Sequence, residues 1–168
     1  MFVYLDNSAT TKQYEAVTAE MLKYMKHDFG NPSSLHGLGI EAEKAVKAAR
    51  VSAAAALGVL TEEVYFTSGG TESDNAAVYG ALTARKRTGK KIITSAVEHP
   101  AMIEACRRAE NEGFEVVYLD VDDRGIIDMA QLESEMDDEV VFVSVMHVNN
   151  ETGTVQPIEM IGSLKDAF

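Results

Sequence analysis

Residues 91–119 have the sequence KIITSAVEHPAMIEACRRAENEGFEVVYL, which joins two apolar runs through one helical pattern. The runs at 91–95 and 114–119 are short and rich in β-branched and aromatic residues, as strands are. Between them, Pro100 stands at the first position of a helix predicted over 100–112, and Gly113 follows its end. A strand, a helix and a second strand of these lengths predict a βαβ unit with parallel strands.

The same alternation extends on both sides of this unit. We expect further strands over 2–5, 63–67 and 140–148, and helices over 13–28, 38–57, 71–87 and 128–136, with a last helix from Pro157. The run at 140–148 is the most apolar, so we expect it to be buried on both faces. In the helix predicted over 128–136, Asp128 should be the N-cap, and Gln131 should complete a capping box. The sequence thus predicts an α/β fold with a mainly parallel sheet and helices on both faces.

Composition and charge limit the class of protein. The 168 residues fit one domain, and 46% hydrophobic with 25% charged residues is typical of a globular protein. The net charge of -12 argues against nucleic acid as a partner, because an acidic surface repels phosphates. No apolar run approaches the roughly 20 residues that span a bilayer, and the start does not resemble a secretory signal. We therefore expect a cytoplasmic protein with no membrane partner.

Ligands of open α/β sheets bind beyond the carboxyl ends of the strands, so the loops after the predicted strands are the first places to search. The loop at 67–75 has the sequence TSGGTESDN. Gly69 and Gly70 allow a close backbone approach to an anion, and Thr71 adds a hydroxyl at the start of the next helix. A plain strand-to-helix turn with good caps explains the same residues. The loop contains neither a Walker motif nor G-x-G-x-x-G.

Two further loops carry polar side chains at predicted strand ends. In 95–100, His99 can stack on a flat ligand and exchange a proton near neutral pH, or it can simply cap the helix or face solvent. In 147–153, Asn150 has both donors and acceptors and can orient a ring oxygen of a cofactor. Asn-Asn before Gly is also ordinary turn chemistry. Each loop alone leaves both interpretations open.

Taken together, the motifs indicate a family. Five of them occur in order: LDNSATT at 5–11, GNPSSLH at 30–36, FTSGGTESDN at 66–75, EHP at 98–100 and VNNETG at 148–153. This set resembles the cysteine desulfurases of the NifS and IscS type, which are pyridoxal-phosphate enzymes of the class V aminotransferase group. The resemblance covers essentially the whole chain. It implies that residues 1–168 form an incomplete large domain of the aspartate aminotransferase-like fold, with 1–15 belonging to or contacting the small domain.

The resemblance also assigns roles. It implies that Gly70 and Thr71 bind the phosphate of pyridoxal 5'-phosphate, that His99 stacks on the pyridine ring and moves protons, and that Asn150 bonds the phenolic oxygen. The family converts L-cysteine to L-alanine and passes the sulfur, as a persulfide, to an acceptor scaffold protein for iron-sulfur cluster or thio-cofactor assembly. Its members are homodimers. No metal site is implied.

Several elements of the family's site have no counterpart among these residues. They are an aspartate beside the pyridine nitrogen, a glutamine, a Ser-x-His-Lys segment with the anchor lysine, and the persulfide cysteine. None of the nine lysines lies in such a segment: Lys90 and Lys91 lead into a strand, and Lys165 lies in a helical stretch. The single cysteine, Cys106, is expected to be a core residue. We therefore expect an amino-terminal portion that is inactive alone and that self-associates through exposed apolar faces and an unpaired strand edge.

Other functions remain compatible with the sequence. A selenocysteine lyase or another class V transaminase would share these motifs, because substrate choice depends on later loops. A non-catalytic module that keeps the phosphate cradle for dimerisation or regulation is a third hypothesis. A Rossmann-type nucleotide-binding domain is disfavoured by the missing glycine fingerprint.

Overall fold

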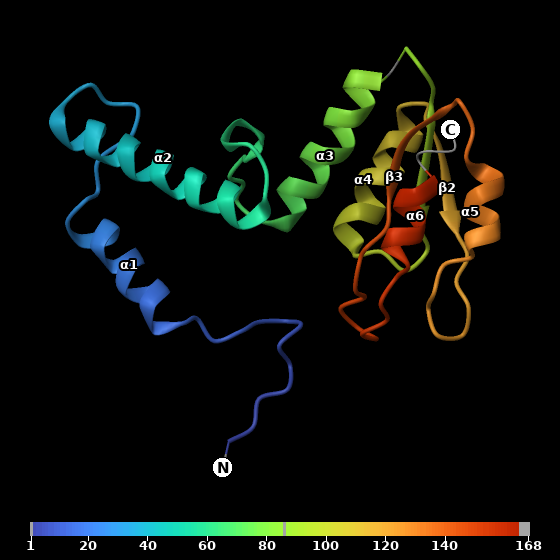
Figure 1. Cartoon of the computed structure of the whole chain (residues 1–168), viewed down its shortest axis with the longest axis horizontal. Helices are drawn as coiled ribbons and strands as arrows, with labels where there is room; N and C mark the ends of the chain where they lie inside the picture. Colours follow the sequence, from blue (N-terminus) through green and yellow to red (C-terminus); the bar gives the residue numbers. More distant parts are fainter. Residues whose placement is uncertain (1, 86, 165–168) are drawn as a thin grey trace. The chain divides into compact units, whose positions relative to one another are not determined.

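The computed structural model describes residues 2–85 and 87–164. The chain divides into two compact units, Met1–Phe66 and Thr67–Phe168 (Figure 1). Lys165, which was expected in a helical stretch, lies outside the described residues, and so does Lys86 of the helix predicted over 71–87.

The first unit is helical. It contains α1 (Glu15–Lys26), α2 (Gly37–Leu57) and the short 3-10 helix η1 (Thr61–Glu63). The strands predicted over 2–5 and 63–67 are wrong, since both segments have irregular backbone apart from the last residue of η1. A strand-like composition shows that the side chains suit a pleated sheet. A strand forms only where a neighbouring strand supplies backbone hydrogen bonds.

This unit buries little apolar surface of its own. None of the residues described in α1 is buried, and Leu35 is 96% exposed. The helix α2 ends at Gly58, which has a φ of 69° and donates its N–H to the Ala54 carbonyl oxygen. No helix in the described part of the chain is both long and apolar enough to span a membrane. The large exposed apolar side chains include Phe2, Leu5, Met25, Phe29, Leu57 and Tyr65.

The second unit contains a three-stranded parallel sheet with the order β2-β1-β3. Its strands are β1 (Lys91–Ser95), β2 (Glu115–Leu119) and β3 (Val140–Ser144). Its helices are α3 (Gly70–Arg85), α4 (Pro100–Asn111), α5 (Met129–Glu135) and α6 (Ile158–Leu164). The central strand is therefore the first of the three in the chain, and it pairs with both of the others.

Helices cover both faces of this sheet (Figure 1). Because side chains alternate along β1, Ile92 packs with α3 and α4 on one face, and Ile93 packs with α5 and α6 on the other. Both isoleucines are fully buried. The predicted fold class, α/β with a parallel sheet between helices, is confirmed.

Burial along the sheet differs from the prediction. The strand buried along its whole length is β1, whereas β3 is half-buried and ends at Ser144 instead of residue 148. The prediction was wrong because an apolar run shows that a strand belongs to a sheet but not whether it lies at the centre or the edge. In this unit β3 is an edge strand, with one side of its ladder open.

The start of α5 confirms one expected cap and corrects another. Asp128 is the N-cap, and its side chain accepts hydrogen bonds from Ala130 N at 2.8 Å and Gln131 N at 3.1 Å. Gln131 does not close a capping box. Its Oε1 instead accepts from Asp120 N at 2.7 Å, because the backbone N–H of Asp128 already donates to Asp120 O at 2.9 Å.

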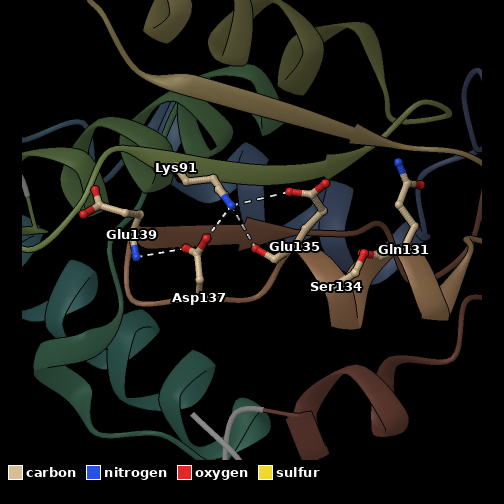
Figure 2. A network of polar contacts seen from close by, with 6 residues as sticks. All are labelled: Lys91, Gln131, Ser134, Glu135, Asp137 and Glu139. Carbon is tan, nitrogen blue, oxygen red and sulfur yellow. Dashed lines mark hydrogen bonds and ion pairs between the residues drawn. The ribbon is translucent and has the colours of Figure 1, made fainter.

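A polar network ties the amino-terminal edge of the sheet together (Figure 2). Lys91 Nζ donates to the Glu135 carbonyl oxygen at 3.2 Å and to Asp137 Oδ2 at 2.6 Å. The other oxygen of that carboxylate, Asp137 Oδ1, accepts from Glu139 N at 2.9 Å. The network joins the first residue of β1 to the segment between α5 and β3.

Candidate functional site

The carboxyl ends of β1 and β3 lie side by side. The two strands are parallel neighbours, and Thr94 pairs with Ser144 at this end. The loops that follow, 95–100 and 145–154, therefore leave the same edge of the sheet. The remaining predicted loop, 67–75, runs into the first turn of α3. This helix packs against α4 and β3.

The loop before α3 is ordered by its own side chains. Ser68 donates from its backbone N–H and from its hydroxyl to Glu72 Oε2, at 2.6 and 2.7 Å. The hydroxyls of Thr67 and Ser73 are 2.7 Å apart. These bonds hold the loop while the first N–H groups of α3, from Gly70 onward, have no carbonyl within the helix to pair with. The hydrogen bonds from Ser68 also lower the pKa of Glu72, so this carboxylate stays ionised.

No neighbouring atom in the described part of the unit crowds the backbone at Gly69 and Gly70. A Cβ atom added to Gly69 or Gly70 would meet nothing within 4 Å. Neither glycine is therefore required by packing within the unit, and the bare backbone leaves room for an anion to approach. The N-terminal end of a helix as long as α3 carries the partial positive charge that such an anion prefers.

His99 is the N-cap of α4. Its Nδ1 accepts a hydrogen bond from Ala101 N at 3.1 Å, and Pro100 occupies the first turn as predicted. Because Nδ1 is the acceptor, the proton of the neutral imidazole is on Nε2. The side chain is exposed. The cap fixes the ring, and the described contacts of this side chain involve Nδ1 and not Nε2.

Asn150 lies at the exposed tip of the loop after β3. An antiparallel bridge between Val148 and Val155 closes this loop. Among the described contacts, Asn150 Nδ2 donates only to the carboxylate of its neighbour Glu151, at 3.0 Å. The loop also has the turn chemistry that its sequence indicated, with Gly153 at a φ of 74°. The side chain of Asn150 is thus presented on a closed, well-defined turn.

Two residues that the sequence did not single out connect these loops. Glu98 Oε1 accepts from Ser95 Oγ and from Met146 N, both at 2.8 Å. Asn149 Nδ2 donates to the Val97 carbonyl oxygen at 3.0 Å. Burial raises the pKa of Glu98, while its two hydrogen bonds oppose the rise. Both residues lie in quoted motifs, but no local pattern reveals these contacts, because Met146 is 48 positions away from Glu98.

The structure gives no second reactive centre in the described residues. Cys106 is fully buried in the core against Met102 and Ala109, as expected, and burial raises the pKa of its thiol to about 11. Among residues 2–85 and 87–164, no group of three or more His, Cys, Asp and Glu side chains is placed to hold a metal ion. The candidate residues are therefore exposed positions in the first turn of α3 and in the two loops that follow β1 and β3.

Comparison with known proteins identifies the family and the fold. Residues 3–167 match the aminotransferase class-V family. The cysteine desulfurase IscS of Methanosarcina thermophila is 48% identical over 162 residues, which are 96% of this chain and 40% of the relative. A solved NifS-like protein matches with a TM-score of 0.94 and 38% identity over 99% of this chain and 46% of that one. SspA, solved in complex with cysteine, matches with a TM-score of 0.90 and 36% identity over 98% and 47%.

The matched region is only part of each relative. The chain spans 43% and 40% of the first two curated relatives, and it corresponds to their amino-terminal portion. The structural similarity confirms the predicted α/β fold of the NifS-like type. The four residues proposed for the site all lie in the unit Thr67–Phe168.

Proposed function

The chain belongs to the aminotransferase class-V family, and we propose that it supplies the phosphate and ring contacts of a pyridoxal-phosphate-dependent cysteine desulfurase. One observation carries the proposal. The loops of His99 and Asn150 leave the same sheet edge and are hydrogen-bonded to each other through Asn149 and Val97. A flat cofactor needs such converging polar groups at the carboxyl end of a parallel sheet.

The phosphate end of the cofactor is assigned to the start of α3. The backbone N–H groups of Gly70 and Thr71 and the Thr71 hydroxyl donate to the phosphate oxygens, aided by the dipole of the helix. The open space beside Gly69 and Gly70 supports this assignment. When bound, pyridoxal phosphate supplies the electron sink for the chemistry on the amino acid, and the protein supplies orientation.

The ring is assigned to His99 and Asn150. The His99 imidazole, held by its bond to Ala101 N, covers the ring and exchanges a proton at Nε2. Asn150 donates from its amide to the phenolic oxygen. Both side chains are exposed, so they reach a ligand without any rearrangement of the core.

We further propose the reaction and the setting. The substrate is L-cysteine, whose sulfur is transferred to a cysteine thiol of the enzyme to give L-alanine and a persulfide. The sulfur then passes to an acceptor scaffold protein for iron-sulfur cluster or thio-cofactor assembly in the cytoplasm. The complex of SspA with cysteine supports the substrate. The functional unit is a homodimer, in which residues 1–15 belong to or contact the small domain, while the rest of this chain forms part of the large domain.

The 168 residues alone are proposed to bind the cofactor without a covalent bond and to release no sulfur from cysteine. None of the nine lysines lies in a Ser-x-His-Lys segment. The test is a binding titration of the chain with pyridoxal phosphate and with pyridoxal, followed by borohydride reduction and mass spectrometry. We expect pyridoxal phosphate to bind more tightly, with no stoichiometric adduct at a single lysine. Equal affinity for the two compounds would refute the phosphate cradle, and one defined adduct would refute the absence of an anchor.

A further inference from the structure

We propose that Asn149 and Glu98 are positioning residues that hold the His99 loop and the Asn150 loop together as one rigid unit. We call their cross-loop hydrogen bonds, Asn149 to Val97 and Met146 to Glu98, the interloop lock. The lock itself rests on contacts within the chain. Its effect on the cofactor rests on the proposed function.

Asn149 bridges the two loops with one side chain. It is only 8% exposed. Its Oδ1 accepts from the backbone N–H groups of Glu151 and Thr152, both at 2.9 Å, which shapes its own turn. Its Nδ2 reaches across to the Val97 carbonyl oxygen at 3.0 Å. The amide oxygen therefore shapes the loop of Asn150, while Nδ2 contacts the loop of His99 and also donates to Met146 Sδ at 3.3 Å.

Glu98 makes the second bridge, in the opposite direction. Its Oε1 accepts from Ser95 Oγ in its own loop and from Met146 N beyond the end of β3, both at 2.8 Å. Both bonds end on the same oxygen atom. A glutamine, which keeps an oxygen at this position, can therefore preserve both bonds, whereas an alanine loses both.

The lock sets the relative position of the two residues proposed to contact the ring. His99 directly follows Glu98, and Asn150 directly follows Asn149. The described side-chain hydrogen bonds of His99 and Asn150 reach only Ala101, in the first turn of α4, and Glu151, the next residue of the same turn. Their separation is thus fixed by their neighbours, which are part of the scaffold and not of the binding surface. Ring contacts that are fixed in advance lower the entropy cost of binding.

Asn149→Asp is the most informative variant. It keeps Oδ1, so the turn at 149–154 can persist, but it places a carboxylate oxygen opposite the Val97 carbonyl oxygen. Glu98→Ala removes the other bridge, and Glu98→Gln is the conservative variant expected to restore it. Asn111→Ala and Glu133→Gln are matched controls, because both residues are exposed on helices away from the two loops.

The first measurement needs no cofactor. Amide hydrogen exchange is followed in the 168-residue chain by mass spectrometry of the segments 95–100 and 145–154. We expect Asn149→Asp to speed exchange in 95–100, and Glu98→Ala to speed exchange in 145–154, at least severalfold in each case. Glu98→Gln should exchange no faster than the wild type, and both controls should match the wild type. If each substitution affects only its own loop, the lock does not exist.

The second measurement separates the ring contacts from the phosphate contacts. We expect Asn149→Asp to weaken pyridoxal phosphate binding by between about threefold and tenfold, the effect of one lost hydrogen bond. Competition by inorganic phosphate should be unchanged, because Gly70 and Thr71 lie on α3. A variant that binds pyridoxal phosphate as the wild type does would overturn the positioning role. If the wild-type chain binds no pyridoxal phosphate, the proposed function fails, and the exchange experiment still decides the lock.

Discussion

Lys91 Nζ lies 2.6 Å from Asp137 Oδ2, and this ion pair joins the first residue of the central strand to the segment that leads into its neighbour β3 (Figure 2). The side chain of Lys91 is only 11% exposed, whereas Asp137 is 48% exposed. The hydrogen bond with Lys91 is the main cause of the lowered pKa of Asp137. The pair lies at the end of the sheet opposite the candidate site, so it is a structural contact that can be tested separately from binding.

Replacing Lys91 by methionine should lower the free energy of unfolding by about 1–2 kcal/mol, because it removes a hydrogen-bonded charge pair that is partly shielded from water. The aliphatic stem is retained, so packing changes little. Urea unfolding of the chain measures the effect, and Lys90→Met, at an exposed neighbouring position, is the control. An equal loss in both variants would show that the ion pair contributes nothing specific.

The stability of the unit should depend on the ionisation of Glu98. Burial raises the pKa of its carboxyl above the ordinary value of 4.5, so the folded state favours the neutral form. The stabilisation by a neutral Glu98 is complete below the unfolded pKa and is lost as the pH rises through the folded pKa. Glu98→Gln, which stays neutral, should therefore gain stability relative to the wild type as the pH rises from acid to neutral values. A stability difference that does not change over this range, as expected for Glu133→Gln, would contradict the shift.

Two glycines should respond differently to alanine. A Cβ at Gly70 meets open space, so Gly70→Ala should leave the free energy of unfolding within about 0.5 kcal/mol of the wild type. It should nevertheless weaken pyridoxal phosphate binding about tenfold or more, because the methyl group fills space proposed for the phosphate. A Cβ at Gly89 would collide with the Glu139 carbonyl, so Gly89→Ala should cost about 1–3 kcal/mol. Unchanged binding in Gly70→Ala would rule out this phosphate cradle.

Substitutions of His99 should separate its two roles. His99→Ala removes the cap on α4 and should cost about 1 kcal/mol of stability, whereas His99→Asn keeps a capping acceptor and should cost less. Both variants should lose affinity for pyridoxal phosphate, because neither has an imidazole to cover the ring. Thermal unfolding and cofactor titration measure the two effects. An asparagine variant that binds as tightly as the wild type would leave His99 with only its capping role.

Cys106 should be chemically inert in the folded chain. Burial raises the pKa of its thiol to about 11, and no part of the side chain is exposed. Iodoacetamide near neutral pH should therefore label it far more slowly in the native chain than in urea. Rapid labelling of the native chain would mean that the core around α4 opens readily.

The sequence predicted those parts of the fold that depend on residues close together in the chain. The strand at 91–95 was predicted with its observed bounds, and the helix from Pro100 differs by one residue at its end. The strand order β2-β1-β3 was not predictable, because consecutive strands are more often neighbours and β3 would then lie beside β2. The half-burial of β3 follows from that order.

The same limit applies to the candidate site. The loops of His99 and Asn150 could be found from the rule that ligands bind beyond strand ends. The roles of Glu98 and Asn149 could not be found, because their partners come from the other loop, and the pairing of β1 with β3 brings the loops together. Whether a polar side chain is a surface residue or a bridge depends on this long-range pairing.

The central position of β1 also has a kinetic consequence. Its register with β2 joins residues 24 positions apart, as in Lys91 and Glu115, and α4 lies in the connection between the two strands. Its register with β3 joins Thr94 to Ser144, 50 positions apart. Closing the longer loop costs more chain entropy, so the β1-α4-β2 unit should assemble first and serve as the template onto which β3 is added. The two loops proposed to hold the cofactor ring would then be brought together in the last step of folding.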